Sequence, residues 1–592
     1  MRANKKTEGL NKGYLFDGKK REYDAPLSSY PRTSFVRNSY FSLNGDWDFA
    51  VSKGETLPVT FSKKIQVPFP CEALDSGVNL LPEPDDILCY RRLILLPDEF
   101  VGKEILIHFD GIDYEAKVYI DRVLVKTHKG MNEGFTIHLS KDTPKRFEII
   151  VQVKDPSDSK GQSRGKQALD PSYWTYTTTT GIYRPVWMEC VPSHRLESVK
   201  FTPDFEKNKI VVHVNANCDG ISKLHLLNKD YEVKNIVDTE IDIGEFRLWS
   251  AIDPYLYPVH LTMEEDEIDT YFAIRKVELK EVNGHQYLYL NGKPLFLSGL
   301  LYQGYCGYNN LTPASIDEYK EDLIKTKEMG FNCLRVHITR LCEAFYTLAD
   351  QMGIYLIQDF PCGGEKRGLI PNCSPRVFNF MNCEKHVNYK WLGREDEKER
   401  EEFLYEGDLL LKELHNHPSI LIYTIFNEGW GEFDPSKTYR RMKAQENQML
   451  FDTASGWYEA DESDFFSVHT YSFPKMKRKN RHNRCFILSE IGGLGLKYGE
   501  SPYQIFCGHG KVKKKEQLSK KIDDLYENKI KPQIQRDGLC GVIYTQFADV
   551  ETEYNGLYDL TREHCKVDVE KMKKHNQALY EEFEKHMKQG GK

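Results

Sequence analysis

From about residue 281 to the C-terminus, short apolar runs alternate with amphipathic segments, and this alternation constrains the fold more than any other feature. The runs are strand candidates because they are short and rich in β-branched and aromatic residues. They lie at 295–299, 333–337, 354–359, 420–426, 457–458, 465–469, 485–489 and 542–546, the two-residue fifth run being the weakest. Helical periodicity appears at 315–329, 342–352, 397–415, 436–450, 515–536 and 569–587. Eight strands with intervening helices over about 310 residues predict a (β/α)8 TIM barrel.

The chain before this region has a different texture. Between 35 and about 190, strand-like runs are separated by turn signals such as Asn44-Gly45, and no long helical period occurs. A second all-β pattern with about seven short strands spans 195–280. We therefore expect a multidomain β and α/β protein: a jelly-roll-like β-sandwich over 1–192, an immunoglobulin-like β-sandwich over 193–280 and the TIM barrel over 281–592. The first sandwich should buttress the barrel rather than act on a substrate.

Composition excludes several classes of protein. With 81 basic and 89 acidic residues, the net charge of −8 does not suit a globally basic nucleic-acid binder. No run of about 18 apolar residues predicts a membrane span, and the N-terminus lacks the apolar core of a signal peptide. The 14 cysteines are scattered without a CxxC pair, which favours reduced thiols in a cytoplasmic protein. Cys383 and His386 have ligand-like spacing, but no second pair accompanies them, so we expect no metal site.

Two glutamates follow the most apolar strand candidates. Glu428 comes directly after the run 420–426 and Asn427, and Glu490 follows 485–489. The active sites of TIM barrels lie at the carboxyl ends of the strands, so these side chains can face each other. Two carboxylates about 5–5.5 Å apart are what a retaining glycosidase needs, one as nucleophile and one as acid/base. A glutamate at a strand end, taken alone, is more often an ordinary surface or loop carboxylate.

Further polar and aromatic residues occur at predicted strand ends, as a polyhydroxylated substrate would require. They are Arg335, His337, Asp359, Trp430, Trp457, His469, Tyr471 and Tyr544. His337 could instead be a structural histidine, and Trp457 a core residue. The long polar connection 361–396 should shape the mouth of the barrel. GxSxG and HExxH motifs are absent, and the glycines at 492–495 and 508–510 lack the spacing of nucleotide-binding loops.

Motifs in all three regions resemble glycoside hydrolase family 2, the family of β-galactosidases, β-glucuronidases and β-mannosidases. They lie at 43–49, 67–70, 109–119, 180–187, 249–257, 272–275, 330–337, 417–420, 426–430 and 487–490. The resemblance implies that Glu428 is the acid/base and Glu490 the nucleophile. It implies that Asn427 binds the sugar 2-hydroxyl, Tyr471 contacts the nucleophile and Arg335 keeps it ionised. His337, Asp359 and His469 match positions that line the sugar subsite.

Some positions depart from the family pattern. Gly493 stands where β-galactosidases have a histidine, and Tyr544 stands where the eighth strand often has a tryptophan. The Asn-x-Lys pair with which β-glucuronidases bind the uronic carboxylate is not evident in 554–566. We expect a retaining hydrolase for a terminal, neutral β-linked hexose, galactose first, that needs no cofactor. A β-glucuronidase or another family 2 exo-glycosidase remains an alternative, as does a non-catalytic carbohydrate-binding or sensing protein. The expected partner is a glycoside or oligosaccharide, with no nucleic acid or membrane, and a homo-oligomer stays open.

Overall fold

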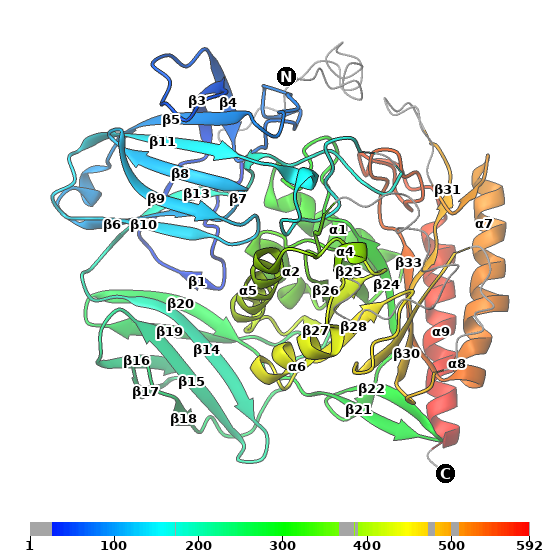
Figure 1. The fold of residues 1–592 in the computed structure, drawn as a ribbon. Coiled ribbons are helices and arrows are strands. Elements are labelled where there is room, and N and C mark those ends of the chain that lie inside the picture. Colours follow the sequence, from blue (N-terminus) through cyan, green and yellow to red (C-terminus); the bar gives the residue numbers. More distant parts are fainter. Residues whose placement is uncertain are drawn as a thin grey trace.

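The structure, a computed structural model, describes residues 26–171, 173–365, 384, 389–471, 480–498 and 508–590. Two β-sandwiches lie one above the other beside a larger barrel, which carries both the green-to-red part of the chain and the C-terminus (Figure 1). This arrangement confirms the predicted fold class. The exact boundaries at 192 and 280 stay a prediction, since Phe35 and Val36 already pair with a strand of the second sandwich.

The first sandwich has a four-stranded sheet, ordered β10-β6-β13-β2, and a six-stranded sheet, ordered β4-β3-β5-β11-β8-β9. In β10 every second residue is buried, as expected of a strand with one face on a core and one in water. Its strands are β2 (Phe41–Ser42), β3 (Gly45–Ser52), β4 (Lys63–Val67), β5 (Ile87–Leu95), β6 (Glu104–Phe109), β7 (Ile112–Asp113), β8 (Glu115–Ile120), β9 (Val123–Lys129), β10 (Phe135–Leu139), β11 (Arg146–Lys154), β12 (Gly181–Ile182) and β13 (Val186–Val191). Its described residues contain no α-helix, only the 3-10 turns η1 (Asp98–Phe100) and η2 (Ser157–Ser159).

The second sandwich packs a five-stranded sheet, β1-β20-β19-β16-β17, on a three-stranded sheet, β14-β15-β18. The strict alternation of buried and exposed residues in β16 again fits one buried face. The strands are β1 (Phe35–Val36), β14 (Leu196–Asp204), β15 (Lys209–Ala216), β16 (Ile221–Leu226), β17 (Lys229–Lys234), β18 (Thr239–Ile241), β19 (Tyr257–Met263) and β20 (Asp266–Phe272). A small antiparallel sheet, β21 (Val277–Val282), β22 (His285–Leu290) and β23 (Lys293–Pro294), leads into the barrel.

The barrel is an eight-stranded parallel sheet, ordered β28-β27-β26-β25-β24-β33-β30-β29. All eight residues of β27 are buried, which explains the continuous apolar run in the sequence. The sheet ends, β28 and β29, meet through a hydrogen bond between the Ser455 and Ser467 hydroxyls, 3.0 Å. The strands are β24 (Leu297–Tyr302), β25 (Cys333–Val336), β26 (Tyr355–Asp359), β27 (Ile420–Asn427), β28 (Leu450–Ser455), β29 (Phe465–Thr470), β30 (Cys485–Gly492) and β33 (Leu539–Thr545).

Amphipathic helices cover the outside of the barrel (Figure 1). The Asp396 side chain caps the first turn of α5 by accepting a hydrogen bond from the Lys398 amide, 2.8 Å. Gly353, with φ of 70°, ends α2 in the left-handed conformation that favours glycine. The helices are α1 (Ile316–Glu328), α2 (Glu343–Met352), α4 (Tyr389–Leu392), α5 (Glu397–Leu414), α6 (Pro435–Gln445), α7 (Lys515–Asp524), the π-helical η4 (Leu525–Ile530), α8 (Lys531–Asp537) and α9 (Val569–Gly590).

One strand was predicted wrongly. The fifth barrel strand is β28 (Leu450–Ser455), not 457–458, and the preceding helix ends at Gln445 rather than at 450. All six residues of β28, LFDTAS, are buried, although three of them are polar. Because of these polar residues, the sequence does not show the apolar run expected of a buried strand. The other seven strands and the six predicted helical segments are confirmed with small shifts at their ends.

Several sequence expectations concern residues outside the described part. Cys383, His386 and most of the connection 361–396 lie outside the described residues. The described cysteines are free thiols, most of them buried. Among the described helices, none combines the length and apolarity that a bilayer crossing requires.

Candidate active site

A cavity of about 380 Å³ opens at the carboxyl ends of the barrel strands. Asn427, Glu428 and Glu490 line it, together with His337 and Tyr471. The structure thus brings together side chains that lie up to 153 residues apart in the chain, as the parallel strand ends predicted.

Glu428 lies in the turn that follows β27. Its backbone φ of 52° is in the left-handed region, which a non-glycine residue adopts rarely and chiefly at functional sites or turns. Its amide donates to the Ser455 carbonyl at 2.9 Å, which ties the turn to the neighbouring strand β28. The turn therefore holds the Glu428 carboxylate at the cavity while the chain leaves the barrel.

Glu490 lies within β30 and is 3% exposed. The Tyr471 hydroxyl donates to its Oε2, and Arg335 Nη1 donates to its Oε1 at 3.3 Å. Burial alone would raise the pKa of this carboxyl, but His469, His337 and Arg335 outweigh burial and hold it well below its usual range. Glu490 is therefore an ionised, hydrogen-bonded carboxylate that faces the cavity.

Arg335 does not line the cavity but donates hydrogen bonds to several of the groups around Glu490. Its guanidinium donates to Asp359 Oδ1 at 2.9 Å, to Asn427 Oδ1 at 2.9 Å and to the Ser489 carbonyl at 3.1 Å. Its side chain is fully buried, and the carboxylates of Asp359 and Glu490 raise its pKa against the effect of burial. A buried cation with two carboxylate partners is fixed in place, so it fixes the orientation of Asn427 and Glu490.

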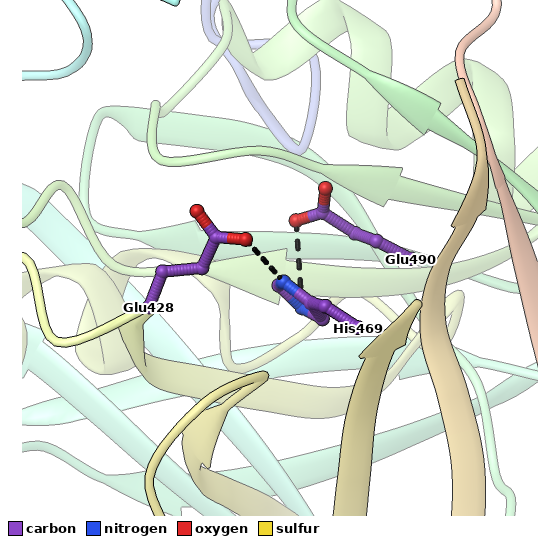
Figure 2. Close-up of side chains that lie close together, drawn as sticks. All are labelled: Glu428, His469 and Glu490. Carbon is purple, nitrogen blue, oxygen red and sulfur yellow. Dashed lines mark hydrogen bonds and ion pairs between the residues drawn. The ribbon is translucent and has the colours of Figure 1, made fainter. Parts of the chain in front are cut away.

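His469 lies between the two glutamates (Figure 2). Its Nδ1 is 2.8 Å from Glu428 Oε1, and its Nε2 is 3.5 Å from Glu490 Oε1 and 3.0 Å from the Ser455 hydroxyl. One carboxylate oxygen of each glutamate and one ring nitrogen of His469 lie within 4.8 Å of one another. Within the described ranges these three form the one group of metal-ligand side chains this close, and it coincides with the carboxylate pair.

His337 and Asp359 form a buried pair at the ends of β25 and β26. His337 Nδ1 is 2.8 Å from Asp359 Oδ2. Burial and the positive charge of Lys166 lower the pKa of His337 to about 4, so the ring is neutral at pH 7. Arg335 and His337 lower the pKa of Asp359 despite its burial. His337 lines the cavity, whereas Asp359 does not and instead holds the His337 ring through this contact.

Tyr544 is placed away from the cavity. Its ring packs against Gly492, where an added Cβ would come within 2.4 Å of the Tyr544 ring. Side chains alternate across a strand, and the cavity is lined by its neighbour Thr545. Trp430 and Trp457 do line the cavity, so Trp457 is not the core residue that the sequence left open.

The first sandwich contributes part of the cavity wall, which corrects the expectation that it only buttresses the barrel. Lys166, Tyr173 and Trp174, from the connection between β11 and β12, line the cavity. Hydrogen bonds hold this connection on the barrel, including Thr177 N to Glu551 Oε1 at 2.7 Å and Thr552 Oγ1 to the Tyr173 carbonyl. Packing between domains leaves no local sequence pattern, although the aromatic cluster at 173–176 in a loop was an available signal.

His509 occupies the space that Gly493 leaves open. A Cβ on Gly493 would lie 2.6 Å from His509 Cδ2. The His509 ring stacks on Tyr471 with centroids 3.4 Å apart, and on Trp174 at 6.2 Å. The position that holds a histidine in the β-galactosidases is thus filled from another segment, and sequence reasoning missed it.

Comparisons with known proteins agree with this architecture. A family model described as "Glycosyl hydrolases family 2, TIM barrel domain" matches residues 280–486. The barrel region of this chain therefore matches the TIM barrel domain of glycoside hydrolase family 2. It is 23% identical over 435 residues to a β-glucuronidase of Streptococcus agalactiae, covering 67% of this chain and 68% of that protein. It is 23% identical over 410 residues to a β-galactosidase of Thermoanaerobacter pseudethanolicus, covering 65% of this chain but only 50% of that protein.

Solved structures of family 2 share the fold over nearly the whole chain. A GH2 β-galacturonidase from Eisenbergiella tayi bound to galacturonate has a TM-score of 0.69 at 18% identity, covering 93% of this chain and 99% of the other. A β-D-glucuronidase from Dictyoglomus thermophilum has a TM-score of 0.70 at 16% identity, covering 93% and 98%. At these identities the likeness concerns the fold.

Proposed function

We propose that this protein is a retaining exo-glycosidase of family 2 that removes a terminal β-linked sugar by double displacement. The observation that carries the proposal is the carboxylate pair of Glu428 and Glu490, whose nearest oxygens lie within 4.8 Å. This spacing suits direct attack by one carboxylate, whereas an inverting enzyme needs room for a water molecule between the two.

In the first step, Glu490 acts as the nucleophile. Its ionised carboxylate attacks the anomeric carbon, and the bond to the leaving oxygen breaks as Glu428 donates its proton to that oxygen. Arg335 and Tyr471 hold Glu490 in line through the hydrogen bonds described above. Because Asn427 Oδ1 already accepts from Arg335, its Nδ2 is oriented to donate to the sugar 2-hydroxyl.

In the second step, Glu428 acts as the base. It takes a proton from water, the water oxygen bonds to the anomeric carbon, and the ester bond to Glu490 breaks. His469, 2.8 Å from Glu428 Oε1, keeps that carboxylate in place for both roles. Two inversions at the anomeric carbon give net retention.

The substrate that we propose is a neutral β-linked hexoside, galactose-configured first. The β-galactosidases among the relatives support this choice, and the β-glucuronidases and the β-galacturonidase make an acidic sugar the competing candidate. A non-catalytic sugar-binding protein would not need an ionised carboxylate aimed at the anomeric carbon. The free, mostly buried thiols support our further proposal that the protein works in the cytoplasm.

The product anomer tests the reaction. Proton NMR during cleavage of an aryl β-glycoside should show the β-anomer forming first, and Glu490→Ala should abolish turnover. An α-anomer as first product would contradict the double displacement, and near-normal activity of Glu490→Ala would contradict the assignment of the nucleophile.

A further inference from the structure

Glu553, in the loop that follows β33, is a cavity-lining carboxylate that the mechanism above does not use. Two domains hold it in place. The Tyr176 hydroxyl, from the first sandwich, donates to its Oε2, and Asn555 Nδ2, from the barrel, donates to its Oε1 at 3.3 Å. The residue is 2% exposed, so the carboxylate is fixed where it meets the cavity.

Lys166 supplies a positive charge to the same cavity from the first sandwich. Its Nζ lies 5.7 Å from the ring centroids of both Tyr176 and Trp430, and no described carboxylate lies within 4.0 Å of it. Its charge lowers the pKa of Glu490 and opposes the rise that burial causes in the pKa of Glu553. Lys166 is therefore a donor near two carboxylates without being paired to either.

The lysine at the end of the 554–566 segment is engaged elsewhere. Lys566 Nζ donates to both Asp549 oxygens, at 2.5 and 2.6 Å, and to the Tyr554 carbonyl at 3.2 Å. All three of its ammonium donors are thus used by the protein. Lys566 lies outside the cavity lining and is not available to pair with a substrate carboxylate.

The charge around the cavity is negative. Even with the acid/base Glu428 protonated, the lining has more acidic residues (Asp158, Asp170, Glu365, Glu490 and Glu553) than basic ones (Arg164 and Lys166). A uronic acid would bring a further negative charge into this site, and juxtaposed like charges oppose binding strongly. The C6 hydroxyl of a neutral hexose carries no charge and is not repelled by these acidic residues.

The acceptor capacity of Glu553 matches a sugar. Each carboxylate oxygen can accept two hydrogen bonds, and in the described part of the chain each accepts one. The remaining two positions suit two neighbouring hydroxyls of one sugar ring. We propose that Glu553 binds a hydroxyl pair of the terminal sugar, with Lys166 as a donor from the first sandwich, so that the site takes neutral β-hexosides and rejects uronides. This proposal rests on the proposed function and names its substrate class.

Two matched pairs of aryl glycosides test the proposal. 4-Nitrophenyl β-galactoside and β-galacturonide differ only in the oxidation of C6, as do the β-glucoside and β-glucuronide. The readout is the ratio of kcat/KM between the neutral and the acidic member, measured for the wild type, Glu553→Gln and Lys166→Met. Glu563→Gln is the control, because it removes a charge from the same connection between β33 and α9 at an exposed residue that does not line the cavity.

The wild type should prefer the neutral member of at least one pair by roughly a hundredfold, given the cost of juxtaposed like charges. Glu553→Gln should lower this ratio at least about tenfold, Lys166→Met should raise it, and Glu563→Gln should leave it unchanged. Preference of the wild type for a uronide would overturn the proposal, and so would an unchanged ratio in Glu553→Gln or no cleavage of either neutral glycoside. In the first two cases retention by Glu490 would still stand, whereas an inverted product would remove the proposed function itself.

Discussion

Removing the Tyr471 hydroxyl should slow the second chemical step far more than the first. In the structure this hydroxyl donates to Glu490 Oε2, and Tyr471 lies partly buried beside the nucleophile. A hydrogen bond to a charged group contributes about 1.5–3 kcal/mol, which corresponds to about 10- to 150-fold in rate. In the second step Glu490 departs as a carboxylate, so Tyr471→Phe loses stabilisation of the leaving group. In the first step the less stabilised carboxylate is the better nucleophile, and this gain opposes the loss of the alignment that Tyr471 gives to Glu490.

Stopped-flow kinetics separates the two steps. With the aryl glycoside that the wild type cleaves fastest, Tyr471→Phe should release a burst of about one aryl alcohol per active site. After the burst, the steady-state rate should be up to about 150-fold lower than that of the wild type. The KM should also be lower, because the glycosyl-enzyme accumulates.

Tyr544→Phe is the matched control. It removes the same atom from a tyrosine that does not line the cavity, so kcat and KM should stay at wild-type values. Our reasoning would be refuted if Tyr471→Phe showed no burst and kept kcat within about threefold of the wild type, since that is below the smallest effect expected of such a bond.

Three further outcomes follow from the site. Glu428→Ala should cleave dinitrophenyl glycosides in the first step but lose at least about a hundredfold on substrates with poor leaving groups, and azide should restore its turnover; no response to azide would contradict the acid/base assignment. Because the folded-state pKa of His337, about 4, lies below its ordinary 6.5, the stability it contributes is full above pH 6.5 and is lost as the pH falls toward 4. The wild type should therefore lose Tm faster than His337→Asn across that window, and parallel Tm curves would contradict the burial argument. Trp174→Ala should raise KM about 2- to 10-fold through loss of the ring stack on His509, while the exposed Tyr405→Ala should not; equal KM values would show that the first sandwich does not contribute to binding.

Glu428 follows β27 and Glu490 lies near the end of β30, and both strands are buried along their whole length, so the continuous apolar runs located both glutamates at the carboxyl end of the barrel. Tyr544 was misplaced because a strand assignment does not say which of two neighbouring residues faces inward. One residue further along, Thr545 lines the cavity instead.

The residues that were missed reach the cavity through packing between distant segments. Lys166 and Trp174 come from a connection in the first sandwich, and Glu553 is held by Tyr176 across the domain interface. His509 fills the space above Gly493 from a different loop. No periodicity or motif of a single element encodes such contacts, so only the assembled fold reveals them.

The most direct test of the double displacement is to trap the glycosyl-enzyme. A 2-deoxy-2-fluoro aryl glycoside slows both steps, and a good leaving group lets the covalent intermediate accumulate. Peptide mass spectrometry after digestion should locate the fluorosugar on Glu490, with one label per chain and loss of activity in proportion. A label on Glu428 or on another residue, or full inactivation without a covalent label, would contradict the account.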